Sequence, residues 1–146
     1  LISSLFFVKF NQLLKNKDNK MKFIASDNLP LAIGPYSPAV KINGIIYTSG
    51  QVPISLDGTI LERDIKVQTR QALSNLRTLL EDSNSGMEKV IKISIYLENI
   101  GDFGVVNVLF AEAFGEHKPA RSTISVKALP MNSMIMLDAI AIANDY

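Results

Sequence analysis

The sequence contains no cysteine and no tryptophan, and His117 is the only histidine among its 146 residues. Without cysteine the chain can form no disulfide, no thiolate nucleophile and no zinc knuckle. One histidine cannot supply a histidine metal cluster or a paired-histidine mechanism within a single chain. We expect His117 to be a solvated or helix-terminal side chain, because a cation is favourable near the end of a helix.

An excess of charge of either sign is also missing. The chain has 15 Lys and Arg against 14 Asp and Glu, which gives a formal net charge of +1. The basic residues are dispersed, so the basic stripe of a nucleic-acid binder is absent. The sequence shows no P-loop, dinucleotide fingerprint or nucleophile elbow. Its length and its hydrophobic content of 47% fit one domain with a sizeable core.

Residues 1–20 differ in composition from the rest of the chain. A short apolar stretch is followed by four lysines, and Asp18 is the only acid. The apolar part is too short to span a bilayer, so we expect no membrane partner. The segment is either a remnant of an organelle-targeting sequence or a non-functional extension ahead of Met21. We place one domain at 21–146 and expect it in the cytoplasm, or in mitochondria or another organelle if residues 1–20 direct it there.

The periodicity of apolar residues predicts an α+β protein. A β-hairpin turning at Asn43-Gly44 is followed by a helix, a strand, a second helix capped by Asp102, and two strands. The predicted ranges are 40–49, 62–82, 89–97, 102–117, 121–126 and 134–142. Both helices should cover one face of a mixed sheet. The other face is also apolar, so we expect a homo-oligomer whose sheets pack together, with any polar cluster at the sheet edge lying between subunits.

Two charged residues in the last two strands are the leading site candidates. Arg121 opens a strand whose alternation places Arg121, Thr123 and Ser125 on one face. Its guanidinium can hold a carboxylate or phosphate through two parallel hydrogen bonds. Asp138 interrupts an apolar run, where a carboxylate needs a partner or a proton, and these are the surroundings of a general acid or base. The alternative is structural: Arg121 is a surface arginine or part of a structural ion pair, and Asp138 is paired with Arg121 or with backbone donors.

Three further polar residues stand out. Tyr36 lies in a loop restricted by two prolines, and Ser49 ends a strand just before Gly50. Asn107 lies on the apolar stripe of the second helix. An amide in that place is either a clamp on a neighbouring segment, such as the one that carries Arg121, or a site residue. Ser49-Gly50 can equally be a simple turn.

Several short motifs occur in a fixed order along the chain: Ile33-Gly34-Pro35-Tyr36, Thr48 to Pro53, Gln71 to Leu76, Val106-Asn107, Phe114 with Glu116-His117, Pro119 to Ser122, and Asp138 to Ala141. Through these motifs the chain from about 21 to 143 resembles the Rid family of enamine/imine deaminases, also called the YjgF or liver-perchloric-acid-soluble-protein (L-PSP) family. The resemblance implies a chorismate-mutase-like α+β fold and a homotrimer whose sheets face a central barrel, with three sites in the clefts between subunits.

The same resemblance implies a chemistry and roles for residues. Family members hydrolyse 2-enamino or 2-imino acids, such as 2-iminobutanoate or 2-iminopropanoate, to 2-oxo acids and ammonia, and neither metal nor organic cofactor is expected. Arg121 would hold the substrate carboxylate. Asp138, where the family usually has glutamate, would orient or activate water. The remaining pocket positions match Tyr36, Ser49, Asn107 and Thr123.

Two departures from the family pattern affect the site. Thr123 stands where the family commonly has cysteine, so a hydroxyl replaces a thiol. The segment between His117 and Pro119 is several residues shorter than in typical members, and it normally helps to form the mouth of the cleft.

Two other functions compete with deamination. An older family name refers to endoribonuclease or translation-inhibitor activity, but the sequence lacks a basic stripe and an aromatic platform with interleaved arginine. The other alternative is a non-catalytic trimer that binds small carboxylates or acts like a chaperone.

Overall fold

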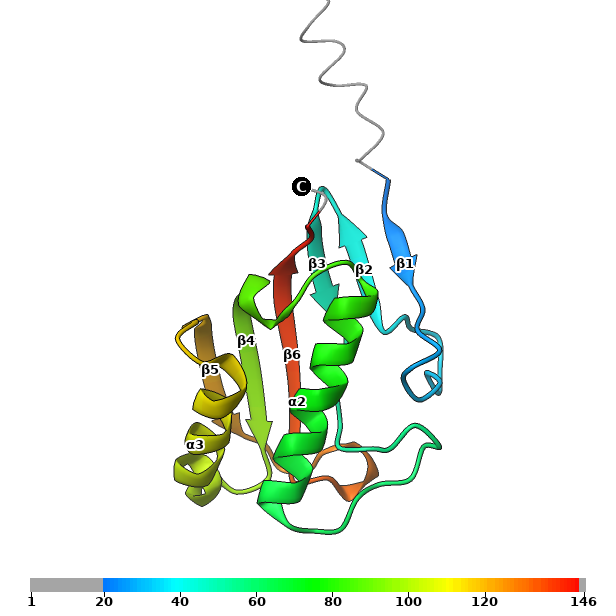
Figure 1. The fold of residues 1–146 in the computed structure, drawn as a ribbon. Helices are drawn as coiled ribbons and strands as arrows, with labels where there is room; N and C mark the ends of the chain where they lie inside the picture. The colour runs from blue at the N-terminus through cyan, green and yellow to red at the C-terminus, as the bar shows by residue number, and fades with distance from the viewer. Residues whose placement is uncertain (1–19, 145–146) are drawn as a thin grey trace, which may run out of the picture.

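A six-stranded mixed sheet carries two helices on one of its faces (Figure 1). This arrangement is seen in a computed structural model that describes residues 20–144. The sheet order is β1-β2-β3-β6-β4-β5, and all neighbours are antiparallel except β4 and β5. The strands are β1 (Lys22–Ile24), β2 (Ala39–Ile42), β3 (Ile45–Thr48), β4 (Val90–Leu97), β5 (Ala120–Ser125) and β6 (Ile135–Ile142).

The helices are α2 (Ile65–Asp82) and α3 (Phe103–Phe114), with short 3-10 turns at Met87–Lys89, Ile100–Asp102 and Pro130–Asn132. The predicted α+β class is confirmed, while the three-residue strand β1 was not predicted. Among residues 20–144, no helix is long and apolar enough to cross a membrane. The predicted extension at 1–20 lies, apart from Lys20, outside the described residues.

The hairpin between β2 and β3 forms as the sequence predicts. Asn43 and Gly44 have φ angles of 51° and 72°. Two consecutive positive φ angles define the type I′ turn, whose twist matches that of the flanking strands.

Helix α2 begins three residues later than predicted because Asp64 is its N-cap. The carboxylate of Asp64 accepts hydrogen bonds from the backbone N–H groups of Lys66 (2.8 Å) and Val67 (3.1 Å). At the other end, Asn84 takes the left-handed conformation with φ 61°. An asparagine in this conformation ends the helix where a glycine is more usual.

The predicted capping of α3 by Asp102 is wrong. Asp102 makes no side-chain capping bond, and the side chain of Asn99 instead accepts a hydrogen bond from Gly101 N at 2.9 Å. Asn99 thereby caps the 3-10 turn Ile100–Asp102, which runs directly into α3. The capping group was misplaced because the sequence pattern does not reveal this extra turn.

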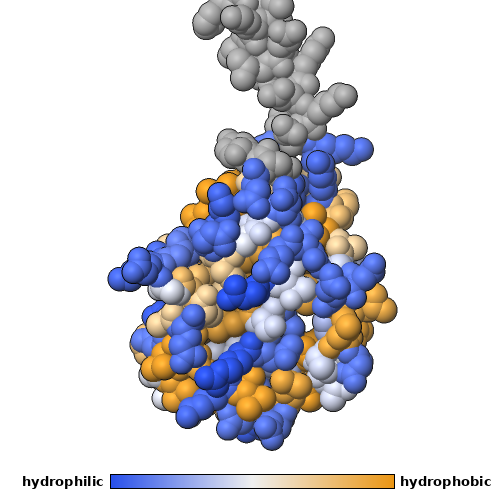
Figure 2. All heavy atoms as spheres, viewed as in Figure 1, coloured by the Kyte–Doolittle hydropathy of each residue, from blue (hydrophilic) through white to orange (hydrophobic). Residues whose placement is uncertain are grey.

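The core lies between the helices and one face of the sheet. Alternate residues of β4 and β6 are buried there, among them Ile93, Ile95, Leu137 and Ala139. The intervening residues of β6 are only partly buried. The apolar run of β6 predicts burial on both of its faces, but within one chain only the face toward the helices is buried. Figure 2 shows that face, on which hydrophilic side chains run along α2 with hydrophobic ones on both sides.

Gln68, a buried amide on α2, ties three chain segments together. It is fully buried, and its Oε1 accepts from Met134 N at 2.8 Å. Its Nε2 donates to the carbonyls of Leu61 and Glu62, both at 3.1 Å. The single side chain thus provides hydrogen-bond partners for backbone groups just before the N-terminal ends of α2 and β6.

We expect Gln68→Leu to lower the free energy of unfolding by about 3 kcal/mol, because it leaves these backbone groups buried without partners. Urea denaturation monitored by circular dichroism measures the loss. Lys66→Leu is the matched control on an exposed position of the same helix and should change stability by less than about 0.5 kcal/mol. Equal losses for both variants would contradict this role of Gln68.

Candidate functional site

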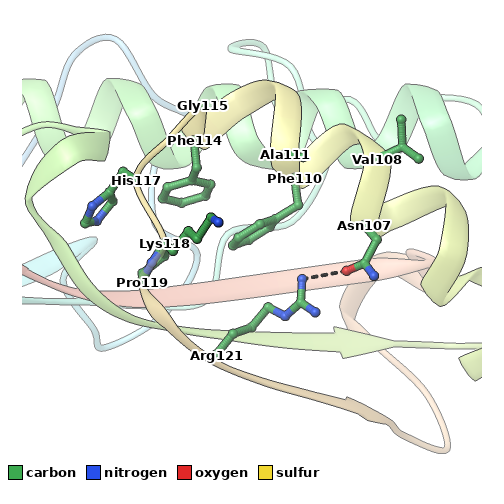
Figure 3. A pocket seen from close by; sticks show the side chains of 10 residues that line it. All are labelled: Asn107, Val108, Phe110, Ala111, Phe114, Gly115, His117, Lys118, Pro119 and Arg121. Carbon is green, nitrogen blue, oxygen red and sulfur yellow. Dashed lines mark hydrogen bonds between the residues drawn. The ribbon is translucent and has the colours of Figure 1, made fainter.

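A cavity of about 680 Å³ lies between α3 and the start of β5 (Figure 3). The second half of α3 forms one wall, and the connection through His117, Lys118 and Pro119 leads from it to Arg121. Phe110 and Phe114 are stacked with their ring centroids 4.4 Å apart, and both line the cavity. The cavity is therefore partly aromatic, with basic side chains along the connection and at Arg121.

Arg121 is held in place by an amide and two aromatic rings. Its Nη1 donates to Oδ1 of Asn107 at 2.7 Å. Its Cζ lies 5.3 Å from the ring centroid of Phe103 and 5.2 Å from that of Phe110, within the range of cation–π attraction. Since a guanidinium carries five N–H donors, the bond to Asn107 leaves the others available to a ligand.

The direction of Arg121 follows from the pairing of β5 with β4. In the parallel register Ile93 lies beside Arg121, and Ile93 is buried under the helices. Arg121 therefore points to the helix-bearing face, where α3 lies. The expectation that Asn107 clamps the segment of Arg121 is confirmed, although both residues are exposed rather than buried as the apolar stripe suggested.

Thr123 lies two residues beyond Arg121 on the same face of β5. Its Oγ1 is buried and has no hydrogen-bond partner in the described part of the chain. A buried hydroxyl without a partner is unusual, so this oxygen is available for a ligand or a water molecule.

His117 was predicted to be solvated or to lie at the end of a helix, and it follows the end of α3, where its backbone N–H donates to the carbonyl of Phe114 at 3.1 Å. It is half-buried, and its Nε2 donates to the carbonyl of Val90 at 2.7 Å. Its ring centroid lies 6.2 Å from that of Phe114. The hydrogen bond fastens the connection after α3 to the start of β4, which fixes the path of the chain toward Arg121.

Asp138 lies on the opposite face of the sheet from Arg121. It pairs with Ser94 of β4, and these positions alternate with residues buried under the helices. Arg121 and Asp138 therefore form no ion pair within one chain. Of the two structural alternatives for Asp138, pairing with Arg121 is wrong.

Tyr96 is a neighbour of Asp138 that the sequence analysis missed. It lies two residues beyond Ser94 and so on the same face. A hydrogen bond to Asp138 raises the pKa of the Tyr96 phenol, and burial and the negative charge of Asp138 raise it further, while a hydrogen bond with Ser94 acts in the opposite direction. The alternation of Lys92, Ser94 and Tyr96 along β4 is the sequence signal that could have revealed this polar row.

Ser49 follows the end of β3, and Tyr36 lies in the loop before β2, where it lines a small pocket together with Gly50 and with Asn75 of α2. Ser49 Oγ donates to the carbonyl of Ser37 at 2.6 Å, which ties the end of β3 to the loop that carries the exposed Tyr36. A Cβ at Gly50 would lie 2.6 Å from Sδ of Met136, so a larger residue there would require the Met136 side chain to shift. Met136 shares its sheet face with Asp138.

The structure brings Arg121, Asn107 and Thr123 together on the helix-bearing face, and this group can bind an anion. Asp138 lies on the opposite face, and Ser49 and Tyr36 lie at the end of β3 and in the loop tied to it. No cluster of three or more potential metal ligands occurs among the described residues.

The chain is similar to characterised sequences over most of its length. The family model described as Endoribonuclease L-PSP matches residues 26–143. A RutC family protein of Pyrococcus horikoshii is 43% identical over 119 residues, or 81% of this chain and 94% of that protein. The 2-iminobutanoate/2-iminopropanoate deaminase of Salmonella typhimurium is 34% identical and covers 83% of this chain and 97% of its own. A Schizosaccharomyces pombe relative named as mitochondrial, mmf1, is 41% identical over 68% of this chain and 61% of its own.

Solved structures share the fold. A conserved Rid family protein of unknown function from Yersinia pestis superposes with a TM-score of 0.83 at 40% identity, over 85% of this chain and all of that one. The structure of Escherichia coli TdcF with bound serine has a TM-score of 0.79 at 30% identity, and the match covers 84% of this chain and 99% of TdcF.

The pairing of Tyr96 with Asp138 predicts that one of the four tyrosines ionises at higher pH than ordinary tyrosine, whose pKa is about 10. Because the folded-state pKa is raised, this bond stabilises the fold fully below the unfolded pKa and is lost as pH rises through the folded pKa. Phenolate absorbance measures the titration.

The component of the absorbance change that titrates at the highest pH should vanish in Tyr96→Phe. In Asp138→Asn it should move to lower pH, since the carboxylate no longer opposes formation of the phenolate. An unchanged late component in Asp138→Asn would show that another group raises the pKa of Tyr96.

Proposed function

Since the chain belongs to the Rid family, whose family model is described as Endoribonuclease L-PSP, we propose that it hydrolyses 2-enamino or 2-imino acids to 2-oxo acids and ammonia. The observation that carries the proposal is the fixed guanidinium of Arg121. It lies on the wall of a cavity, and it has N–H donors beyond the one that bonds to Asn107. The deaminase of Salmonella typhimurium and the serine-bound TdcF, both of this family, support a small amino-acid-like ligand.

Arg121 would hold the substrate through two hydrogen bonds to its carboxylate. The hydrogen bond that Arg121 donates to Asn107, together with the rings of Phe103 and Phe110, restricts the guanidinium beforehand, so little side-chain freedom is lost on binding. The carboxylate then fixes the adjacent C=N carbon in one position. Positioning of this kind can account for much of the rate enhancement of a reaction with water.

The chemistry needs no covalent nucleophile. Water adds to the carbon of the protonated imine, and the resulting carbinolamine loses ammonia to leave the 2-oxo acid. An enamine first takes up a proton on carbon and becomes the protonated imine. Asp138 would accept a proton from the attacking water and return it to the departing amine. The hydroxyls of Tyr36, Ser49 and Thr123 would line the cleft.

This division of roles requires two chains, because Arg121 and Asp138 lie on opposite faces of one sheet. A homotrimer with its sheets around a central barrel would bring Arg121 of one subunit near Asp138 of the next. The uncovered sheet face supports such packing, since Phe23, Tyr47 and Ile124 are 71%, 47% and 51% exposed. Burial of aromatic and aliphatic surface of this kind favours association.

Arg121→Ala should reduce imine hydrolysis about 100-fold, which corresponds to the loss of a charged, bidentate hydrogen-bonded contact. The measurement is the rate of 2-oxobutanoate formation when the purified protein is added to a threonine dehydratase reaction. Arg70→Ala is the matched control, because Arg70 makes only an exposed ion pair with Glu112 at 3.5 Å. Absence of acceleration by the wild-type protein would exclude 2-iminobutanoate as a substrate.

Asp138→Asn distinguishes an enzyme from a carboxylate-binding protein. We expect turnover to fall by at least about 100-fold, as for loss of a general base, while calorimetry shows 2-oxobutanoate bound with little change. Asp102→Asn, which removes a carboxylate that makes no capping bond, should leave both measurements unchanged. Full activity in Asp138→Asn would remove Asp138 from the mechanism and favour another proton acceptor.

A further inference from the structure

The cavity beside Arg121 is lined by basic side chains and by no acidic one. Three of its residues are basic, namely His117, Lys118 and Arg121. Figure 3 shows the side chains of Lys118 and Arg121 both extending toward the ring of Phe110. In the part of the chain that the structure describes, neither forms an ion pair with Asp or Glu. The cavity therefore has a positive electrostatic character that the protein itself does not neutralise.

Two cations that share one cavity repel each other, and the repulsion grows as water is excluded. An anion between them removes this cost, and walls of low dielectric concentrate the attraction. Phe110 and Phe114 supply such a wall, since both are more than 90% buried and stacked on each other. A ligand with one carboxylate would engage Arg121 and leave the charge of Lys118 unmatched.

We propose that the preferred substrates are 2-imino dicarboxylates, the class derived from acidic amino acids. Arg121 holds the carboxylate next to the imine carbon, and Lys118 holds the carboxylate at the far end of the side chain. The methylene groups between them lie against the Phe110 and Phe114 rings. This inference rests on the proposed deaminase function and specifies its substrate.

The roles of the two cations suit their chemistry. A guanidinium is a planar fork that fixes the orientation of the reacting end. A lysine ammonium is a compact charge on a flexible stem, so it can reach the far carboxylate of substrates of four or five carbons without a fixed geometry. The cavity, at about 680 Å³, has room for either length of chain.

The test compares binding of 2-oxoglutarate with that of 2-oxopentanoate, which has the same carbon chain without the second carboxylate. Isothermal titration calorimetry at low ionic strength should show about fivefold tighter binding of 2-oxoglutarate, as expected for one partly exposed ion pair. Lys118→Gln should abolish this preference, so that 2-oxoglutarate and 2-oxopentanoate bind with equal affinity. Lys127→Gln, a change at an exposed lysine just beyond β5, should preserve the preference.

Activity is measured in parallel on imines generated in situ by amino-acid oxidases from glutamate, aspartate and norvaline. Faster hydrolysis of the two dicarboxylates, reduced to the norvaline level in Lys118→Gln, supports the inference. Equal binding of the two oxo acids by the wild-type protein, or a preference that survives Lys118→Gln, overturns it even when 2-iminobutanoate is hydrolysed. Failure to hydrolyse any imine overturns the deaminase proposal instead, and the calorimetry then still decides whether the cavity selects dicarboxylates.

Discussion

The contact between Arg121, Asn107 and two phenylalanine rings determines how α3 and β5 are built. A guanidinium on the helix-bearing face of an edge strand must be met by groups that tolerate charge, and α3 supplies them from successive turns through Phe103, Asn107 and Phe110. Phe103 is 38% exposed, so its ring borders solvent while the guanidinium lies over it. Residues of one helix thus fix the position of one cation, which is a common arrangement where a binding site is built into a fold.

The alternation of side chains across the sheet separates the two charged residues that the sequence marks most strongly. Arg121 lies beside Ile93 and faces the helices, while Asp138 lies beside Ser94 and faces away from them. No change of rotamer can bring groups on opposite faces of a sheet into contact. The proposed reaction therefore depends on association between chains, and the uncovered sheet face with Tyr47 and Ile124 is where apolar surface is available for it.

The sequence predicted the parts of the fold that depend on local patterns. The Asn43-Gly44 turn, the long strands β4 and β6, and the buried stripe of α2 all follow from periodicity and turn chemistry. The role of Asn99 in place of Asp102 was missed because the sequence pattern does not reveal the extra 3-10 turn before α3. Likewise, the pattern identified Arg121 and Asp138 as candidates, but only the register of β5 and β6 against β4 shows that they face opposite ways.

Incomplete hydrogen bonding marks both halves of the proposed site, but it is not sufficient evidence alone. Thr123 Oγ1 is buried without a partner, yet so is Thr69 Oγ1 within α2. Thr123 differs because it shares a strand face with Arg121, where a ligand would complete its bonding. Asp138 has a hydrogen bond from Tyr96, and a carboxylate has about four acceptor positions. Its remaining capacity can orient water, and the bond from Tyr96 restricts the shorter aspartate side chain while it does so.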